Sequence, residues 1–319
     1  MKLREIHEFF VQEGKKTDPR GIEAVEKFLK KKADAFKELK EEEKEEFDKE
    51  SLWNPYSDCR VYHGSGNEEI HSIMVGIDIE GPELLLANEL KKQGRKIDLV
   101  LAHHPEGKAL AGLYSVMGMQ ADILNKYGVP INVAESLMGE RIGEVEKGLS
   151  PLNHLRSIEF ARLLNIPFMN THTTSDNHVQ KFLLELFEEK KPETLADALK
   201  LLKQMPEYKE AIKNDAGPKI FVGSQNSRCG KIVVDMTGGT EGHDKNYEAL
   251  GKAGVGTIIA MHVAKEMRKV AEENKVNIIV AGHMASDTIG LNILLDKLEK
   301  KQKFEIIECS GFTRVRRNK

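Results

Sequence analysis

The chain has 319 residues, of which 40% are hydrophobic, and its 48 Lys+Arg nearly balance 51 Asp+Glu. This length allows two α/β lobes or one large domain with a substantial core. The formal net charge of -3 argues against a mainly electrostatic nucleic-acid-binding protein, which would carry a basic excess.

No stretch approaches the roughly 20 apolar residues that span a bilayer, and the N-terminal segment lacks the apolar core of a signal peptide. The three cysteines, Cys59, Cys229 and Cys309, lie far apart and form no CxxC pair. We therefore expect a cytoplasmic protein that binds no membrane and has neither a disulfide framework nor a cysteine zinc site. Any metal must then be held by nitrogen and oxygen ligands.

The N-terminal region predicts a long, charged helix over residues 20–50. Apolar residues recur there at three- and four-residue steps, with Lys and Glu on the other faces: Val25, Phe28, Leu29, Phe36 and Leu39. The composition changes at Trp53-Asn54-Pro55. We therefore predict an N-terminal helical segment, residues 1–55, followed by one α/β region, residues 56–319.

Short apolar runs alternate with amphipathic stretches after residue 56, which predicts βα units and an α/β fold. The expected strands are 73–79, 97–102, 129–133, 219–222, 231–236, 257–261, 276–281 and 304–308. The expected helices are 83–93, 152–164, 179–190, 194–205, 245–253, 263–273 and 287–300. Residues 180–217 are polar and rich in Lys and Glu, so we predict a helical insert there between two α/β halves.

Four histidine-bearing segments share one layout, in which an apolar strand-like run precedes the histidine and a helix or turn follows it. In open α/β sheets, ligands collect outside the carboxyl ends of the strands, so these segments can converge in space. The residues concerned are His103 and His104 in one segment, His172 and Asp176 in the next, then His262, and finally His283 and Asp287.

These residue types suit a metal site, because neutral imidazole and carboxylate are the usual ligands of Zn²⁺, Mn²⁺ and Fe²⁺. His103 and His104 would point opposite ways on a regular strand, but at a bent strand end they could face two neighbouring ions. His283 and Asp287 are one helical turn apart. Each motif alone also fits a surface turn or a chance HxxxD helix, so a metal site and ordinary polar residues both stay open.

Three of these segments, taken in order, resemble the motifs of the Nif-three-like family, also called the GTP cyclohydrolase 1 type 2 homologue family. They are His103-His104-Pro105, then His172-Thr173-Thr174-Ser175-Asp176, and Gly282-His283-Met284-Ala285-Ser286-Asp287. The resemblance covers roughly residues 60–315. It implies two related α/β lobes with a dinuclear metal site between them, and often a homo-oligomer in the form of a hexameric ring.

Carried over residue by residue, the resemblance implies five ligands to two divalent ions such as Zn, Fe or Mn: His103, His104, Asp176, His283 and Asp287. The family usually has Glu at the position of Asp287. Because Asp is one methylene shorter, bridging both ions would require its helix to approach more closely. We expect His172 and His262 to orient the ligands or a bound water, although a core histidine is an equal alternative for His262.

Two ions about 3.5–4 Å apart activate water and clamp oxygen-bearing substrates, which predicts hydrolysis of a nucleotide or phosphoester by a metal-bound hydroxide. Glu106 or Glu241 could move protons, although ordinary surface carboxylates fit both positions, and no residue is assigned as catalytic. The glycine-rich segment 238–242 could hold an anion or form a plain tight turn. The alternative function is a non-enzymatic, metal-binding regulatory or scaffold protein.

Overall fold

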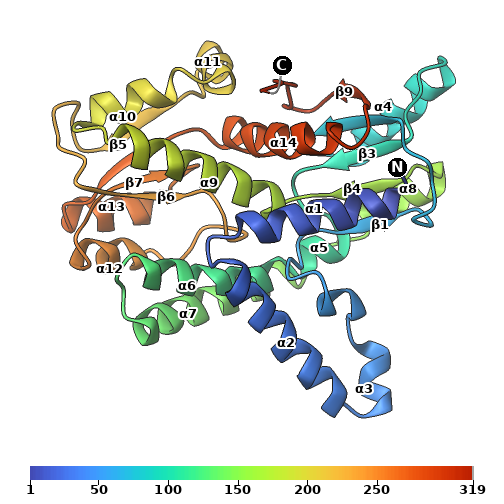
Figure 1. The fold of residues 1–319 in the computed structure, drawn as a ribbon, viewed down its shortest axis with the longest axis horizontal. Coiled ribbons are helices and arrows are strands. Elements are labelled where there is room, and N and C mark those ends of the chain that lie inside the picture. The colour runs from blue at the N-terminus through green and yellow to red at the C-terminus, as the bar shows by residue number, and fades with distance from the viewer. Residues whose placement is uncertain (318–319) are drawn as a thin grey trace.

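A computed structural model describes residues 1–317, which form two sheets with helices on both faces of each (Figure 1). The first sheet has the order β1-β4-β3-β2-β9, with β1 antiparallel to β4 and the other neighbours parallel. Its strands are β1 (Val61–His63), β2 (Ser72–Gly76), β3 (Leu99–Ala102), β4 (Phe168–Asn170) and β9 (Glu305–Glu308).

The second sheet has the order β5-β8-β7-β6, in which β5 is antiparallel to β8 and the other pairs are parallel. Its strands are β5 (Lys219–Val222), β6 (Lys231–Asp235), β7 (Val255–Ala260) and β8 (Asn277–Val280). Helices cover both faces of the parallel strands, so inner strands such as β2 and β3 are buried throughout rather than on alternate residues. The predicted α/β fold is confirmed.

Four helices cover the first sheet. On one face, Val75 and Leu101 pack against α1 (Leu3–Thr17) and the C-terminal part of α14 (His283–Glu299). On the other face, Met74 and Val100 pack against α4 (Gly81–Lys92) and α8 (Arg156–Leu164). The connection between β3 and α8 contains α5 (Gly107–Ala111), a 3-10 helix (Leu113–Gly118), α6 (Met119–Lys126) and α7 (Ile131–Leu149).

The second sheet has α6, α7, α12 (Asn246–Lys252) and α13 (Lys265–Glu273) on one face. Its other face carries α9 (Thr173–Lys190), α10 (Leu195–Leu202) and α11 (Pro206–Lys213). The boundary predicted at residue 180 falls in the middle of α9, and the buried side chains of Leu183 and Phe187 make this helix part of the second core.

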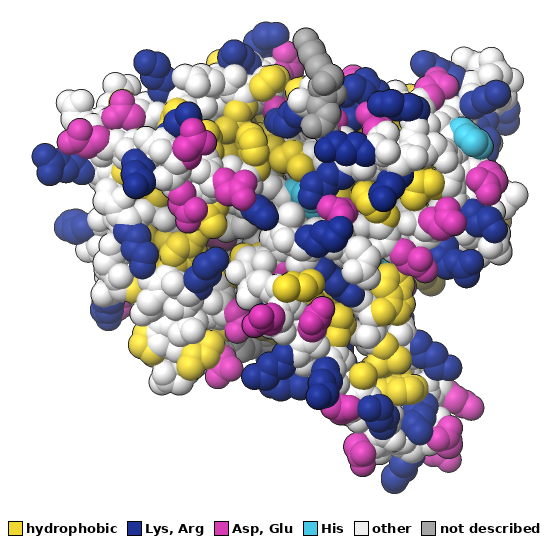
Figure 2. All heavy atoms as spheres, viewed as in Figure 1, with side chains coloured by type: hydrophobic (Ala, Val, Ile, Leu, Met, Phe, Trp, Pro, Cys, Tyr) yellow, Lys and Arg dark blue, Asp and Glu magenta, His cyan; other side chains and the backbone are white. Residues whose placement is uncertain are grey.

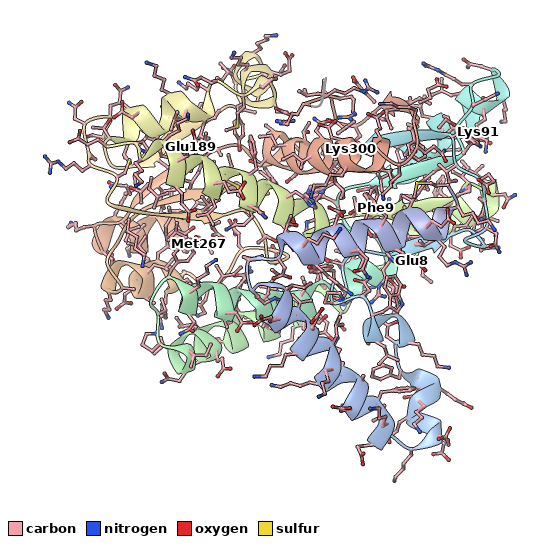
Figure 3. All side chains as sticks on the ribbon, in the orientation of Figure 1. Glu8, Phe9, Lys91, Glu189, Met267 and Lys300 are labelled. Carbon is pink, nitrogen blue, oxygen red and sulfur yellow. The ribbon has the colours of Figure 1, made fainter. Side chains whose placement is uncertain are left out.

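The helices α9 and α14 link the two lobes. Figure 3 marks their outer ends, with Glu189 near the end of α9 over the second sheet and Lys300 just after α14 over the first. Their N-terminal turns meet between the lobes. A Cβ added to Gly290 of α14 would lie 2.4 Å from the carbonyl oxygen of Ser175 on α9. The two backbones are therefore as close as a glycine permits.

The predicted N-terminal segment is helical, but its parts differ in burial. The helix α1 belongs to the first core through Leu3, Ile6 and Phe10. The long helix expected over 20–50 is divided into α2 (Ile22–Glu38), α3 (Glu41–Glu46) and a 3-10 helix (Lys49–Leu52). Figure 1 shows α2 and α3 projecting from the body, and we call them the arm.

The arm is a helical hairpin that is anchored at its base by ionic contacts. The break at Leu39 lets α3 fold back, so that the rings of Phe36 and Phe47 lie 4.8 Å apart. At the base, Glu50 contacts His7 at 2.8 Å and Arg60 at 3.0 Å.

Figure 2 shows basic and acidic side chains interspersed over the face of the molecule that is seen in Figure 1, as the near-neutral composition predicts.

The strand predicted at 129–133 is wrong, because Pro130 precedes the first residue of α7 there. A short apolar run does not distinguish a strand from the start of a helix, and proline favours a helix start. Within residues 1–317, no helix is long and apolar enough to cross a bilayer. The cytoplasmic location stays a prediction.

Candidate metal centre

The structure brings together all five side chains expected to bind metal. His103 and His104 follow β3, Asp176 lies in the first turn of α9, His283 is the first residue of α14, and Asp287 lies one turn after it. Possible ligand atoms within 4.8 Å of one another form one group with His103, Asp176 and Asp287, and another with His104, His283 and Asp287. Asp287 is common to both groups.

The two carboxylate oxygens of Asp287 face different partners. Its Oδ1 lies 3.5 Å from His103 Nε2, while its Oδ2 lies 3.6 Å from His104 Nε2 and 3.7 Å from His283 Nε2. These distances are too long for hydrogen bonds. They match the edges of a coordination shell, since ligand atoms about 2.1 Å from a tetrahedral ion lie roughly 3.4 Å apart.

Asp287 therefore lies near both groups of histidines although its side chain is one methylene shorter than the glutamate expected from the resemblance. The shorter side chain requires α14 to lie closer, and Gly290, one turn after Asp287, provides the close approach of α14 to α9.

His103 is held as a neutral imidazole with a free Nε2 lone pair. Its Nδ1 lies 3.2 Å from the Thr171 carbonyl oxygen, to which it donates, and 2.9 Å from Ser175 Oγ. Burial lowers the pKa of His103 to about 4, and the neighbouring histidines act in the same direction against the charge of Asp287. At neutral pH this ring is in the form that binds metal.

Four buried acceptor atoms converge here without a hydrogen-bond donor among residues 1–317: His103 Nε2, Asp176 Oδ1 and both Asp287 oxygens. Burial, followed by the charges of Asp287 and Asp58, raises the pKa of Asp176 well above its ordinary value. Such an arrangement costs several kcal/mol unless a cation compensates it. The residues therefore fit a divalent ion.

Two aspartates that sequence reasoning missed orient the histidines. Asp78 Oδ1 lies 2.6 Å from His104 Nδ1, and Asp58 Oδ2 lies 2.8 Å from His172 Nδ1. Carboxylates on the far nitrogen of a histidine fix its tautomer and orientation. Asp78 follows β2 and so had the same strand-end signal as the histidines, whereas Asp58 lies in a loop before β1 with no such signal.

The two histidines expected to orient ligands, His172 and His262, occupy different positions relative to the candidate ligands. His172 is grouped with His103 and His104, and its Nε2 is 3.7 Å from Asp176 Oδ2, so its position suits a ligand as well as an orienting residue. The ring of His262 lies 4.7 Å from that of His283 but outside the ligand groups. Its Nδ1 contacts Glu241 Oε1 at 2.7 Å, and this bond raises the pKa of His262.

The two glutamates considered for proton transfer are separated. Glu241 lies beside the cluster through His262, whereas Glu106 begins α5 and faces Ser157 and Arg156 near α8. The glycine-rich segment packs closely, since Gln120 Nε2 donates to the carbonyl oxygens of Gly238 and Thr240 at 2.7 Å each. The tight-turn alternative therefore describes it better than an anion cradle.

The cluster opens into a cavity that continues into the second lobe. His172, Asp176 and His283 line its near end, and residues of α6, β6, the glycine-rich segment, α12, β7 and α13 line the rest. The volume open to the centres of water molecules is about 90 Å³, which accommodates several waters. His104 and His283 are partly exposed, while His103 and Asp287 are buried.

Comparison with solved structures finds a NIF3 superfamily protein from Sphaerobacter thermophilus, with 30% sequence identity and a TM-score of 0.70. The match covers 80% of this chain and 91% of that one. Reduced HcgD from Methanocaldococcus jannaschii matches with 15% identity and a TM-score of 0.52, over 84% and 94% of the two chains, and this likeness concerns the fold alone. No family model and no curated protein matches the sequence.

Proposed function

Because the chain belongs to the NIF3 superfamily, we propose that it is a metal-dependent hydrolase in which two divalent ions share Asp287. The substrate class is a nucleotide or another phosphoester. The observation that carries this proposal is the division of the Asp287 carboxylate, with Oδ1 towards His103 and Oδ2 towards His104 and His283.

The residues divide into two ligand sets that differ in exposure. The buried set is His103, Asp176 and Asp287 Oδ1, and the more open set is His104, His283 and Asp287 Oδ2. When bound, the two ions supply Lewis-acid activation of a water and of a substrate oxygen. Catalytic sites keep an open coordination position. The partial exposure of the second set supports an enzyme rather than a purely structural site.

The surrounding residues would orient the histidines and exchange protons with the substrate. Asp58 and Asp78 accept hydrogen bonds from the Nδ1 atoms of His172 and His104 and so keep each Nε2 aimed at the cluster. Glu241 accepts from His262 Nδ1, which leaves His262 Nε2 to exchange a proton with a substrate in the cavity. In this proposal Glu241 acts through His262 rather than directly.

A homo-oligomer is also part of the proposal. The adjacent helices α4 and α8 carry large apolar side chains that are 39–72% exposed: Leu85, Leu86, Phe160 and Leu163. Exposed apolar patches commonly mark subunit contacts. Light scattering of the purified chain tests this part, and a monomer at micromolar concentration would contradict it.

The hydrolase proposal is tested by loading the purified protein with Mn²⁺, Zn²⁺ or Fe²⁺ and assaying p-nitrophenyl phosphomonoesters and diesters together with nucleotides. We expect hydrolysis that Asp287→Ala abolishes and Asp34→Asn, at an exposed arm position, leaves intact. A full metal complement without turnover of any compound would contradict the hydrolase and favour the scaffold alternative.

A further inference from the structure

The cavity beside the cluster has an apolar wall in the second lobe. The wall is formed by Val233 of β6, Ile258 of β7, Leu250 of α12 and Met267 of α13, all buried in the core between the second sheet and helices α6, α7, α12 and α13. Figure 3 labels Met267 on the second-lobe side of the molecule. A wall of this kind favours a ring or an alkyl group over a phosphate.

One carboxylate faces this cavity without a partner. Asp235 ends β6 and lines the cavity, and its side chain makes no hydrogen bond or ion pair with any residue in 1–317. Burial raises its pKa to about 6, with His262 opposing this shift and Glu241 adding to it. Its side chain is accessible to solvent through the cavity. An unpartnered carboxylate that reaches into a cleft beside a candidate catalytic centre indicates a ligand-binding group.

Two amide side chains add acceptor oxygens, beside the hydroxyl and imidazole groups that also line the cavity. Asn246 lines it, and its buried Oδ1 has no hydrogen-bond partner among the described residues. Gln120 donates from its Nε2 to the two carbonyl oxygens of the glycine-rich segment, which leaves its Oε1 as the acceptor available to a ligand. Within residues 1–317, no Lys or Arg lines the cavity.

We propose that this cavity is a specificity pocket for a substrate part that is planar or apolar and carries N–H donors, with Asp235 as the residue that binds them. Carboxylate and amide oxygens accept from N–H groups, and a carboxylate in a wall without Lys or Arg repels anions. A protonated amine, an amidine and an amino-substituted ring share this chemistry.

The inference rests on the proposed function and extends it by orienting the substrate. The oxygen-bearing end would lie at the histidine and aspartate cluster, and the N–H-bearing end at Asp235. A phosphoester whose other end is an anion or a plain alcohol would then bind poorly.

The test uses the metal-loaded full chain and two probes of nearly equal shape, benzamidine and acetophenone. Benzamidine carries N–H donors and a positive charge, whereas acetophenone carries neither. We expect ligand-observed NMR titration to show benzamidine binding at least about tenfold tighter, since a charge-assisted hydrogen bond favours it. Asp235→Asn should weaken benzamidine at least about tenfold and leave acetophenone within about twofold.

Glu248→Gln is the matched control, because Glu248 lies on the same helix two residues after Asn246, does not line the cavity and pairs with Lys252. It should leave both affinities unchanged. The proposal is overturned if the wild-type protein shows no preference, or if Asp235→Asn binds benzamidine like the wild type. Should Asp235→Asn fail to fold, the wild-type preference decides, with Asn246→Leu as the second variant, expected to weaken benzamidine.

Metal content is measured for every variant, so that a loss of benzamidine binding in the cavity is distinguished from a loss of metal at the histidine and aspartate cluster. Because the binding assay needs no turnover, it is independent of the hydrolase test. Turnover without a benzamidine preference refutes the pocket alone, whereas a preference without turnover refutes the hydrolase.

Discussion

The buried hydrogen bond between Asp58 and His172 gives a prediction about metal affinity. The Asp58 carboxylate is fully buried, and its Oδ2 accepts from His172 Nδ1 at 2.8 Å and from the Thr173 hydroxyl at 2.6 Å. Burial alone would raise the pKa of Asp58, but the hydrogen bond and charge of His172 outweigh it and lower the pKa. Asp58 is therefore an ionised group that fixes the direction of His172 Nε2.

Asp58→Asn keeps the size of the side chain and removes its charge. A hydrogen bond to a charged group contributes about 1.5–3 kcal/mol, against about 1 kcal/mol for a neutral one, so the variant loses about 0.5–2 kcal/mol of the energy that orients His172. With about 1.4 kcal/mol per tenfold change, this predicts metal binding that is about 2- to 30-fold weaker. Histidine-orienting carboxylates have effects of similar size, about 10- to 100-fold.

The assay is a competition titration of Zn²⁺ against a chromogenic chelator at pH 7.5, with a thermal melt of each protein. Asp34→Asn is the control, since Asp34 is exposed and pairs only with Lys37. An Asp58→Asn protein that melts normally and binds zinc as tightly as the wild type would refute the assigned role of this pair.

Two further substitutions test the anchoring of the arm and the packing behind the cluster. Burial would raise the pKa of Glu50, but His7 and Arg60 outweigh it and lower the pKa from 4.5 to about 2. Glu50→Gln should therefore lower the free energy of unfolding at pH 7, measured by urea denaturation, by about 2 kcal/mol. Gly290→Ala would place a Cβ 2.4 Å from the Ser175 carbonyl oxygen. It should therefore cost about 1–3 kcal/mol of unfolding free energy and weaken zinc binding.

Each substitution has its own contradicting result. A depressed carboxylate pKa stabilises the fold above pH 4.5 and less so as the pH falls towards 2, so the effect of Glu50→Gln should shrink over that window. A difference that stays constant with pH would contradict the assignment. Gly139→Ala on α7, where no atom lies within 4 Å of the added Cβ, should be neutral or stabilising by about 1 kcal/mol. Equal effects at Gly139 and Gly290 would contradict close packing of α14.

The convergence of the candidate ligands was predictable because it depends on local pattern and one topological rule. An apolar run followed by His103 and His104 marks a strand end, and parallel strands bring their carboxyl ends to the same edge of a sheet. The same rule also marks Asp78 and Asp235, which follow or end apolar strands. We missed these two because single aspartates are common at strand ends and only the histidines repeated.

Other features depend on contacts between distant segments, which no local pattern encodes. Asp58 meets His172 across 114 residues, from a loop whose position is set by the surrounding core. The helix α1 has no signal that separates a core helix from a solvated one until its partner α9 is placed. The start of α7 was mistaken for a strand because a short apolar run fits both structures.

We propose that the cluster would hold two ions with Asp287 as a ligand common to both. The most direct test is the number of ions per chain, measured by elemental analysis after dialysis against excess Zn²⁺ or Mn²⁺ and removal of unbound metal. The account predicts two ions per chain in the wild type and the loss of both in Asp287→Ala, with the fold retained by circular dichroism. A wild-type protein that saturates at one ion, or a folded Asp287→Ala protein that still binds two, would contradict it.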